Sequence, residues 1–151
     1  MMNARFSSAL AAYAAFLSAT AAYGAPTSQS GCSAHREFAI VIHGGLPQAG
    51  KEFPGRLVAM KTVLKAARAG LRSGRSALDA VEAAVGAMED SGLFNAGRGA
   101  MANEKGFVET DAGIMDGAGQ RYGAVASMIG LKNPVAAARL VMDKTRHALM
   151  V

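Results

Sequence analysis

The stretch Gly92-Leu-Phe-Asn-Ala-Gly-Arg-Gly-Ala-Met-Ala-Asn103 lies between a segment with helical periodicity and a segment with strand-like sequence. Its apolar pair, Leu93 and Phe94, can anchor it to a core, and its three glycines allow backbone shapes that other residues disfavour. Asn95 follows the pair with an amide that both donates and accepts hydrogen bonds. We interpret this stretch as a shaped, functional loop and not as a plain linker.

Two helices are expected before this loop. The first ends at Ser73-Gly74 and places apolar residues at three- and four-residue steps, which is typical of one buried face: Met60, Val63, Leu64, Ala67 and Leu71. The second begins at the capping box Ser76-Ala-Leu-Asp79 and stops at Ser91-Gly92. Its expected buried stripe is Leu78, Val81, Val85 and Met88, and Ala80, Ala83 and Ala84 are expected to permit close packing. The short connection predicts an antiparallel helical hairpin.

An apolar run, Phe38-Ala-Ile-Val-Ile42, precedes these helices and ends at His43-Gly-Gly45. A continuous apolar run predicts a strand that is covered on both faces. The breakers in Leu46–Gly55 predict a loop before the first helix. A histidine directly after a buried strand is catalytic in some proteins, but His43 is more often a hydrogen-bonded structural residue.

An antiparallel hairpin and a third helix are expected after the loop. The hairpin strands are Phe107–Met115 and Tyr122–Leu131, joined by a turn at Asp116-Gly117. Asn133-Pro134 places a capping residue before a proline at the first helical position, and the helix runs to about Thr145. Arg146–Val151 resembles the start of another strand, so we expect the chain to end mid-fold.

The N-terminus predicts export. A short basic start and an apolar, alanine-rich run predict a signal peptide over residues 1–25, followed by a linker over 26–36 and a periplasmic or secreted protein. An uncleaved N-terminal anchor is the alternative. Cys32 is the only cysteine, so no intrachain disulfide can form.

The net charge of +5 has a simple interpretation. Four basic residues recur at helical spacing and are expected to form a solvated face: Lys61, Lys65, Arg68 and Arg72. The chain has no tryptophan, aromatics make up 6%, and no docking motif occurs, so we expect no nucleic-acid partner.

Several nominal chemical motifs fail. Gly97-Arg-Gly99 lacks the third glycine of a dinucleotide loop and the Gly-Lys-Ser/Thr ending of a P-loop. The histidines are too scattered for a zinc site. Glu109, Asp111 and Asp116 could form an acid/base set, but structural acids at strand ends are the better interpretation. The residues alone therefore predict a layered α/β domain with one special loop and no complete catalytic apparatus.

Five motifs, in order, resemble the plant-type asparaginase/isoaspartyl peptidase family of N-terminal-nucleophile hydrolases: Ile42-His-Gly-Gly45, Ser76–Val85, Leu93–Gly99, Ile114-Met-Asp-Gly117, and Asn133-Pro134 with Ala138–Met142. The resemblance implies a four-layer αββα sandwich, here incomplete. Residues 37–151 would be its α-subunit portion, truncated at the C-terminus.

The same resemblance implies hydrolysis of L-asparagine and β-aspartyl (isoaspartyl) dipeptides. A precursor cuts itself before a threonine, and this new N-terminal residue of the β subunit is the nucleophile. No counterpart of that subunit occurs here, because Thr62, Thr110 and Thr145 lie in the wrong context. The family forms (αβ)2 assemblies, so the chain alone is expected to be inactive. The alternatives are a non-catalytic remnant or binding module, and a glycosylasparaginase-type amidohydrolase.

The resemblance assigns only supporting roles to residues of this chain. Asn95 matches an asparagine beside the nucleophile, and Gly44 and Gly45 match a glycine turn tied to self-cleavage. A structural sodium ion, with no organic cofactor, would be held by the backbone carbonyls of Met88, Glu89, Ser91, Phe94, Ala96 and Arg98. Two departures concern local turn geometry: Leu46-Pro47 replaces small residues, and Gly113 stands where a serine is common.

Overall fold

A computed structural model of the chain describes residues 38–45 and 53–151, which belong to one unit, Phe38–Val151. The expected signal peptide, the linker, Cys32 and the departure at Leu46-Pro47 lie outside the described residues. The elements run in the order α1 (Phe53–Arg72), α2 (Ala77–Ser91), η1 (Gly97–Gly99), β1 (Glu109–Asp116), β2 (Arg121–Ile129), α3 (Pro134–Lys144) and β3 (Leu149–Met150). This mixture of helices and strands confirms the α/β class.

The helical hairpin forms as expected, but α1 begins earlier than predicted. It starts at Phe53, so Pro54 and Gly55 lie in its first turn and not in a loop. Proline is tolerated there because the first backbone N–H groups of a helix have no partner within it. Val63 and Ala67 are buried against α2. The four basic residues of the predicted solvated face are exposed. None of the helices among the described residues is long and apolar enough to cross a membrane.

Both predicted ends of α2 are confirmed. Ser76 Oγ accepts a hydrogen bond from the Asp79 N–H at 3.1 Å, and Gly92 ends the helix with φ +69°. The predicted stripe is wrong at Val81, which is 43% exposed. Ala80 and Ala84 are buried, which confirms that small residues let α2 approach its neighbours closely, whereas Ala83 is exposed.

The predicted strand at Phe38–Ile42 is wrong in its pairing and its burial. The segment has no strand partner among the described residues. Ile40 and Ile42 pack against the Val63 cluster, whereas Val41 is 91% exposed. An extended chain points successive side chains in opposite directions, so a single covering layer buries only every second residue.

The hairpin of β1 and β2 is confirmed as antiparallel, and β3 adds to β2 in parallel, giving the order β1-β2-β3. A register shift interrupts the first pair after Thr110, where Ser127 adopts φ +54°. The Asp111 carboxylate accepts the Ser127 N–H at 2.7 Å and so stabilises the bulge. This contact supports the structural interpretation of Asp111.

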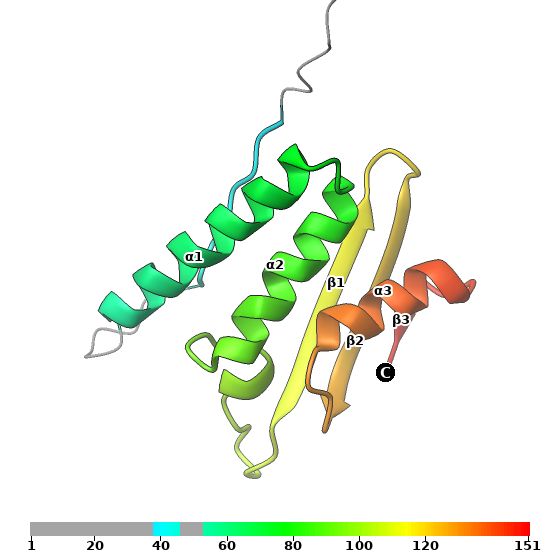
Figure 1. Ribbon diagram of the computed structural model, residues 1–151. Helices are drawn as coiled ribbons and strands as arrows, with labels where there is room; N and C mark the ends of the chain where they lie inside the picture. The colour runs from blue at the N-terminus through cyan, green and yellow to red at the C-terminus, as the bar shows by residue number, and fades with distance from the viewer. Residues whose placement is uncertain (1–37, 46–52) are drawn as a thin grey trace, which may run out of the picture. The chain divides into compact units, whose positions relative to one another are not determined.

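Helices α2 and α3 pack on the same face of this sheet (Figure 1). The core between them is formed by Ile114, Val125, Val135, Ala138, Val141 and Met142. Gly123 of β2 lies directly under α3, since a Cβ added there would be 2.5 Å from the Met142 nitrogen. A glycine at this position allows the helix backbone to approach the strand.

The opposite face of the sheet has exposed apolar side chains, and the acids Glu109 and Asp111 of β1 lie on the same face. Met115 is 70% exposed, and its partner across the hairpin, Tyr122, is 49% exposed. Gly113 belongs to this face of β1, where an added Cβ would be 2.9 Å from the Tyr122 hydroxyl. The expectation that Gly113 affects a turn is therefore wrong, because the residue lies within a strand.

Ion pairs connect the helices to the hairpin. Asp143 of α3 contacts both Arg139, one turn earlier, and Arg121 of β2. Arg139 also reaches Asp79 and Glu82 of α2 at 3.1 Å, and Arg121 pairs with Asp116 at 3.0 Å. Hydrogen bonding to Arg139, with a further contribution from Arg121, lowers the pKa of Asp143 below its ordinary value of 3.8.

We expect Asp143→Asn to weaken the dependence of stability on acid pH. A carboxylate with a lowered folded-state pKa contributes stability above its unfolded pKa and loses it as the pH falls through the folded value. The urea midpoint of the wild-type chain should therefore fall more steeply below pH 3.8 than that of Asp143→Asn. Glu104→Gln is the matched control, since Glu104 is exposed and has no ion pair among the described residues. Equal slopes for wild type and Asp143→Asn would contradict the prediction.

Candidate functional site

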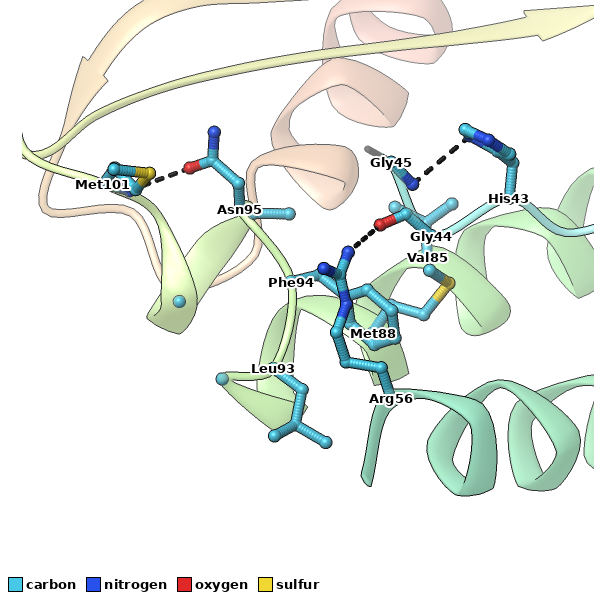
Figure 2. A pocket seen from close by; sticks show the side chains of 13 residues that line it. His43, Gly44, Gly45, Arg56, Val85, Met88, Leu93, Phe94, Asn95 and Met101 are labelled. Atoms are coloured by element: carbon cyan, nitrogen blue, oxygen red, sulfur yellow. Dashed lines mark hydrogen bonds between the residues drawn. The ribbon is translucent and has the colours of Figure 1, made fainter. Parts of the chain in front are cut away.

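A cleft of about 590 Å³ lies between the segment ending at Gly45 and the loop that follows α2. Most of the residues with expected supporting roles meet there (Figure 2). The lining residues are His43, Gly44, Gly45, Arg56, Val85, Met88, Gly92, Leu93, Phe94, Asn95, Ala96, Gly99 and Met101. The structure thus brings together the two motifs that flank the helical hairpin in sequence.

The loop after α2 is a tight structure whose glycines are required by contact. Gly97 adopts φ +54°, and an added Cβ would be 2.6 Å from the Glu89 Cβ. At Gly99 an added Cβ would collide with the carbonyl oxygens of Phe94 and Gly92. The backbone of the loop therefore folds directly onto the end of α2, and Phe94 is buried as its apolar anchor.

Asn95 is held by its side-chain oxygen. Oδ1 accepts the backbone N–H of Met101 at 2.8 Å, which closes the loop across six residues. The side chain is exposed at the cleft, and its amide nitrogen points away from Met101 (Figure 2). This nitrogen has no hydrogen bond to the described residues, so its donors are not used within the described chain.

The glycine turn is fixed by two side chains. His43 Nδ1 accepts the Gly45 N–H at 3.2 Å, which supports the structural interpretation of His43. Arg56 of α1 donates to the Gly44 carbonyl, and its guanidinium lies 5.1 Å from the centre of the Phe94 ring. Arg56 therefore links the glycine turn to the loop anchor by a hydrogen bond and a cation–π contact. Sequence reasoning missed Arg56, because the predicted loop ended next to it and no motif marked it.

Two of the predicted sodium ligands, Met88 and Phe94, have carbonyl oxygens that accept hydrogen bonds within the chain. The Ser91 hydroxyl donates to the Met88 carbonyl at 2.7 Å, and the Phe94 carbonyl accepts the Ala96 N–H at 2.7 Å. Each carbonyl has a second lone pair, and the oxygens of Phe94 and Gly92 crowd the space beside Gly99. Carbonyl oxygens are the type of ligand that a hard cation prefers. Groups of three or more His, Cys, Asp or Glu side chains suited to a metal are absent from the described part of the chain.

Glu89 is a buried acid at the end of α2, with 2% of its surface exposed. Its Oε1 accepts the Val135 N–H at 3.1 Å, so it satisfies a free donor at the N-terminus of α3. Burial raises the pKa of Glu89, and the nearby Asp90 adds to this effect, while hydrogen bonds from Val135 and Asn133 oppose it. No signal in the sequence marked this carboxylate as buried.

Asn133 occupies the N-cap position of α3 as predicted, but its side chain does not cap the helix. Its side chain makes no capping hydrogen bond and instead donates to Glu89 Oε2 at 3.2 Å and to Asp90 Oδ1 at 3.1 Å. The carboxylate acceptors attract its amide away from its own helix. Pro134 does occupy the first turn, as predicted.

The remaining candidates lie outside the cleft. Of the predicted sodium ligands, Glu89, Ser91 and Arg98 do not line it. Glu109 accepts from Asn103, whereas Asp116 pairs with Arg121, so these acids do not converge on one acid/base centre. The three threonines of the described chain donate to backbone carbonyls: Thr62 to Val58, Thr110 to Met128 and Thr145 to Val141.

Comparison with known proteins decides the family. A family model described as Asparaginase matches residues 36–151. The chain belongs to the plant-type asparaginase family. Among its relatives, the plant-type L-asparaginase of Pyrococcus abyssi is 45% identical over 115 residues, which are 75% of this chain and 37% of the relative. The isoaspartyl peptidase/L-asparaginase of Xenopus laevis is 46% identical over 113 residues, 74% of this chain and 36% of the relative.

A third relative, the probable isoaspartyl peptidase/L-asparaginase 2 of Arabidopsis thaliana, is 42% identical over 119 residues, covering 75% of this chain and 36% of the relative. This asparaginase-family chain therefore spans little more than a third of the length of the curated relatives it matches. The family resemblance drawn from five sequence motifs is confirmed.

Proposed function

We propose that this chain forms the supporting half of the active site of a hydrolase of L-asparagine and β-aspartyl (isoaspartyl) peptides. The observation that carries the proposal is the cleft that Asn95 and the Gly44–Gly45 turn both line. Family membership supplies the reaction class, since relatives are named L-asparaginases and isoaspartyl peptidases.

In this proposal the nucleophile is an N-terminal threonine of a β segment that autoproteolysis releases. The three threonines of the described chain do not lie in the sequence context of the family's nucleophile, and their hydroxyls donate to backbone carbonyls. Asn95 would donate its free amide hydrogens beside that nucleophile, and Arg56 would hold the glycine turn and Phe94 in register. Such positioning lowers the barrier by fixing the reacting groups before reaction.

The β segment would also complete the fold. The uncovered face of the hairpin, with Met115 and Tyr122 exposed, supports a second sheet packed against it, as in a four-layer αββα sandwich. Two such αβ units would form the (αβ)2 assembly. A sodium ion held by carbonyls of the loop after α2 would stiffen the site, and the predicted signal peptide over residues 1–25 supports a periplasmic or secreted enzyme.

The same uncovered face favours a second candidate function, a non-catalytic binding module. Contiguous exposed apolar surface often marks a site for a protein partner. In this case the chain would bind a partner through the hairpin and need no threonine segment for its role.

The test is an activity assay on the 151-residue chain, alone and co-expressed with a family β segment that begins with threonine. We expect no ammonia release from L-asparagine by the chain alone and measurable release by the pair. Assays with an isoaspartyl dipeptide and with glycosylasparagine decide the substrate class, including the glycosylasparaginase alternative. Full activity of the chain alone, or a tight complex without any hydrolysis, would contradict the proposal, and the second outcome supports the binding module.

Asn95→Ala should lower the kcat of the restored pair about tenfold, the effect of losing roughly 1.4 kcal/mol of transition-state stabilisation. Lys65→Ala is the matched control, because Lys65 is exposed on the solvated face of α1. An unchanged kcat in Asn95→Ala would show that Asn95 does not contribute to the reaction.

A further inference from the structure

Two buried or half-buried side chains join the end of α2 to the beginning of α3. The Glu89 carboxylate accepts from the Val135 N–H with one oxygen and from the Asn133 amide with the other. The Asn133 amide also lies 3.4 Å from the Gly86 carbonyl and 3.1 Å from Asp90 Oδ1. These contacts span more than forty residues of sequence, so they fix the position of α3 against α2.

The main chain of Glu89 also supports the loop that carries Asn95. Its Cα and carbonyl oxygen would each be 3.0 Å from a Cβ added to Gly97, so the loop rests directly on it. One residue therefore contacts the loop through its backbone and α3 through its side chain. The Glu89 side chain is buried and both of its oxygens are hydrogen-bonded, so its torsions are restricted and its backbone and carboxylate are held together between the loop and α3.

We propose that Glu89 and Asn133 are positioning residues, which together set the geometry of the loop Gly92–Gly99 from the N-terminus of α3. In this arrangement α3 is the second anchor of the loop, beside the Phe94 ring. Helix α3 in turn packs on Gly123 of β2 and pairs with Arg121. Contacts therefore run from the hairpin through α3 and the Glu89–Asn133 pair to the loop of the candidate site.

The consequence for catalysis rests on the proposed function, but the positioning role is measured without activity. The reporters are backbone amides of the loop. The Gly99 N–H donates to the Ala96 carbonyl, the Ala100 N–H to the Gly97 carbonyl and the Met101 N–H to Asn95 Oδ1. Their hydrogen exchange in the full 151-residue chain reports on local opening of the loop.

Two variants test the pair. Asn133→Ala removes the amide that donates to Glu89. Glu89→Gln replaces Oε2 with an NH2 group, which then opposes the Asn133 amide because both groups are donors. The oxygen that accepts the Val135 N–H remains. We expect the three loop amides to exchange about tenfold faster in each variant, a loss typical of one hydrogen bond to a charged group. The side-chain amide resonances of Asn95 should shift as well. Amides of Ala124 and Val125 in the central strand serve as the internal reference for global unfolding.

Glu82→Gln is the matched control. Glu82 lies on the same helix as Glu89, but its carboxylate contacts Arg139 and not the loop. Faster exchange confined to the loop in both variants, with Glu82→Gln unchanged, supports the proposal. Equal acceleration of loop and β2 amides would show a merely structural role and overturn it, as would unchanged loop exchange. Glu89→Gln is the milder change. If Asn133→Ala does not fold, loop exchange in Glu89→Gln alone tests the proposal. The hydrogen-exchange result does not depend on hydrolase activity. If the paired enzyme shows no hydrolysis, the proposed function is contradicted but the positioning role of Glu89 and Asn133 is not.

Discussion

Gly123→Ala should destabilise the chain by about 3 kcal/mol, at the upper end of the usual range for an overpacked core. The added methyl group would meet the Met142 nitrogen at 2.5 Å and the Met142 Cβ at 2.6 Å, and the Ala138 carbonyl lies closer still. Two of these three atoms belong to the backbone of α3, so no change of rotamer relieves the collision. Urea unfolding of the full chain, followed by circular dichroism, measures the loss.

Gly117→Ala is the control for that substitution. Gly117 lies in the turn between β1 and β2, has no atom within 4 Å of an added Cβ, and does not adopt a positive φ. We expect its midpoint to match the wild type. A Gly123→Ala chain as stable as Gly117→Ala would show that α3 does not pack against β2 as described.

Gly97→Ala should disrupt the loop that carries Asn95. Two costs add at this position: a left-handed residue with a Cβ costs roughly 1–2 kcal/mol, and the methyl group would meet Glu89 at 2.6 Å. We expect a combined loss of about 3 kcal/mol in loop stability once the overpacking of the Glu89 contact is included. Hydrogen exchange of the Gly99 and Met101 amides should become fast.

Gly92→Ala separates the two costs, since Gly92 adopts φ +69° with no atom within 4 Å of an added Cβ. It should lose only the conformational part, about 1 kcal/mol, and keep the loop amides protected. If Gly92→Ala and Gly97→Ala lose equal stability, contact with Glu89 does not shape the loop.

Local sequence signals predicted most elements correctly. The three- and four-residue spacing on α1 identified Val63 and Ala67 as buried, and Ser76 and Gly92 marked both ends of α2. These signals work because helix periodicity and end capping depend on neighbours within a few residues. The cleft was predicted only as far as the resemblance allowed, through Asn95 and the Gly44–Gly45 turn.

The errors occur where distant residues decide the outcome. Asn133 precedes a helix as capping residues do, but its side chain bonds to carboxylates more than forty residues earlier in the chain. Val81 fits an apolar stripe but faces outward, because α2 packs through its alanines. Phe38–Ile42 has the composition of a strand, yet pairing requires a neighbouring chain, which composition does not supply.

The sequence by itself determined the family, the buried face of α1, both ends of α2, the hairpin and the glycine-rich loop beside Asn95. Tertiary structure alone decided that Arg56 links the glycine turn to Phe94, that Glu89 is buried under α3, and that Gly123 must lack a side chain. The reason is physical: periodicity and capping act over single helical turns. A buried carboxylate or a backbone collision depends on which segments meet, and these are separated by tens of residues along the chain.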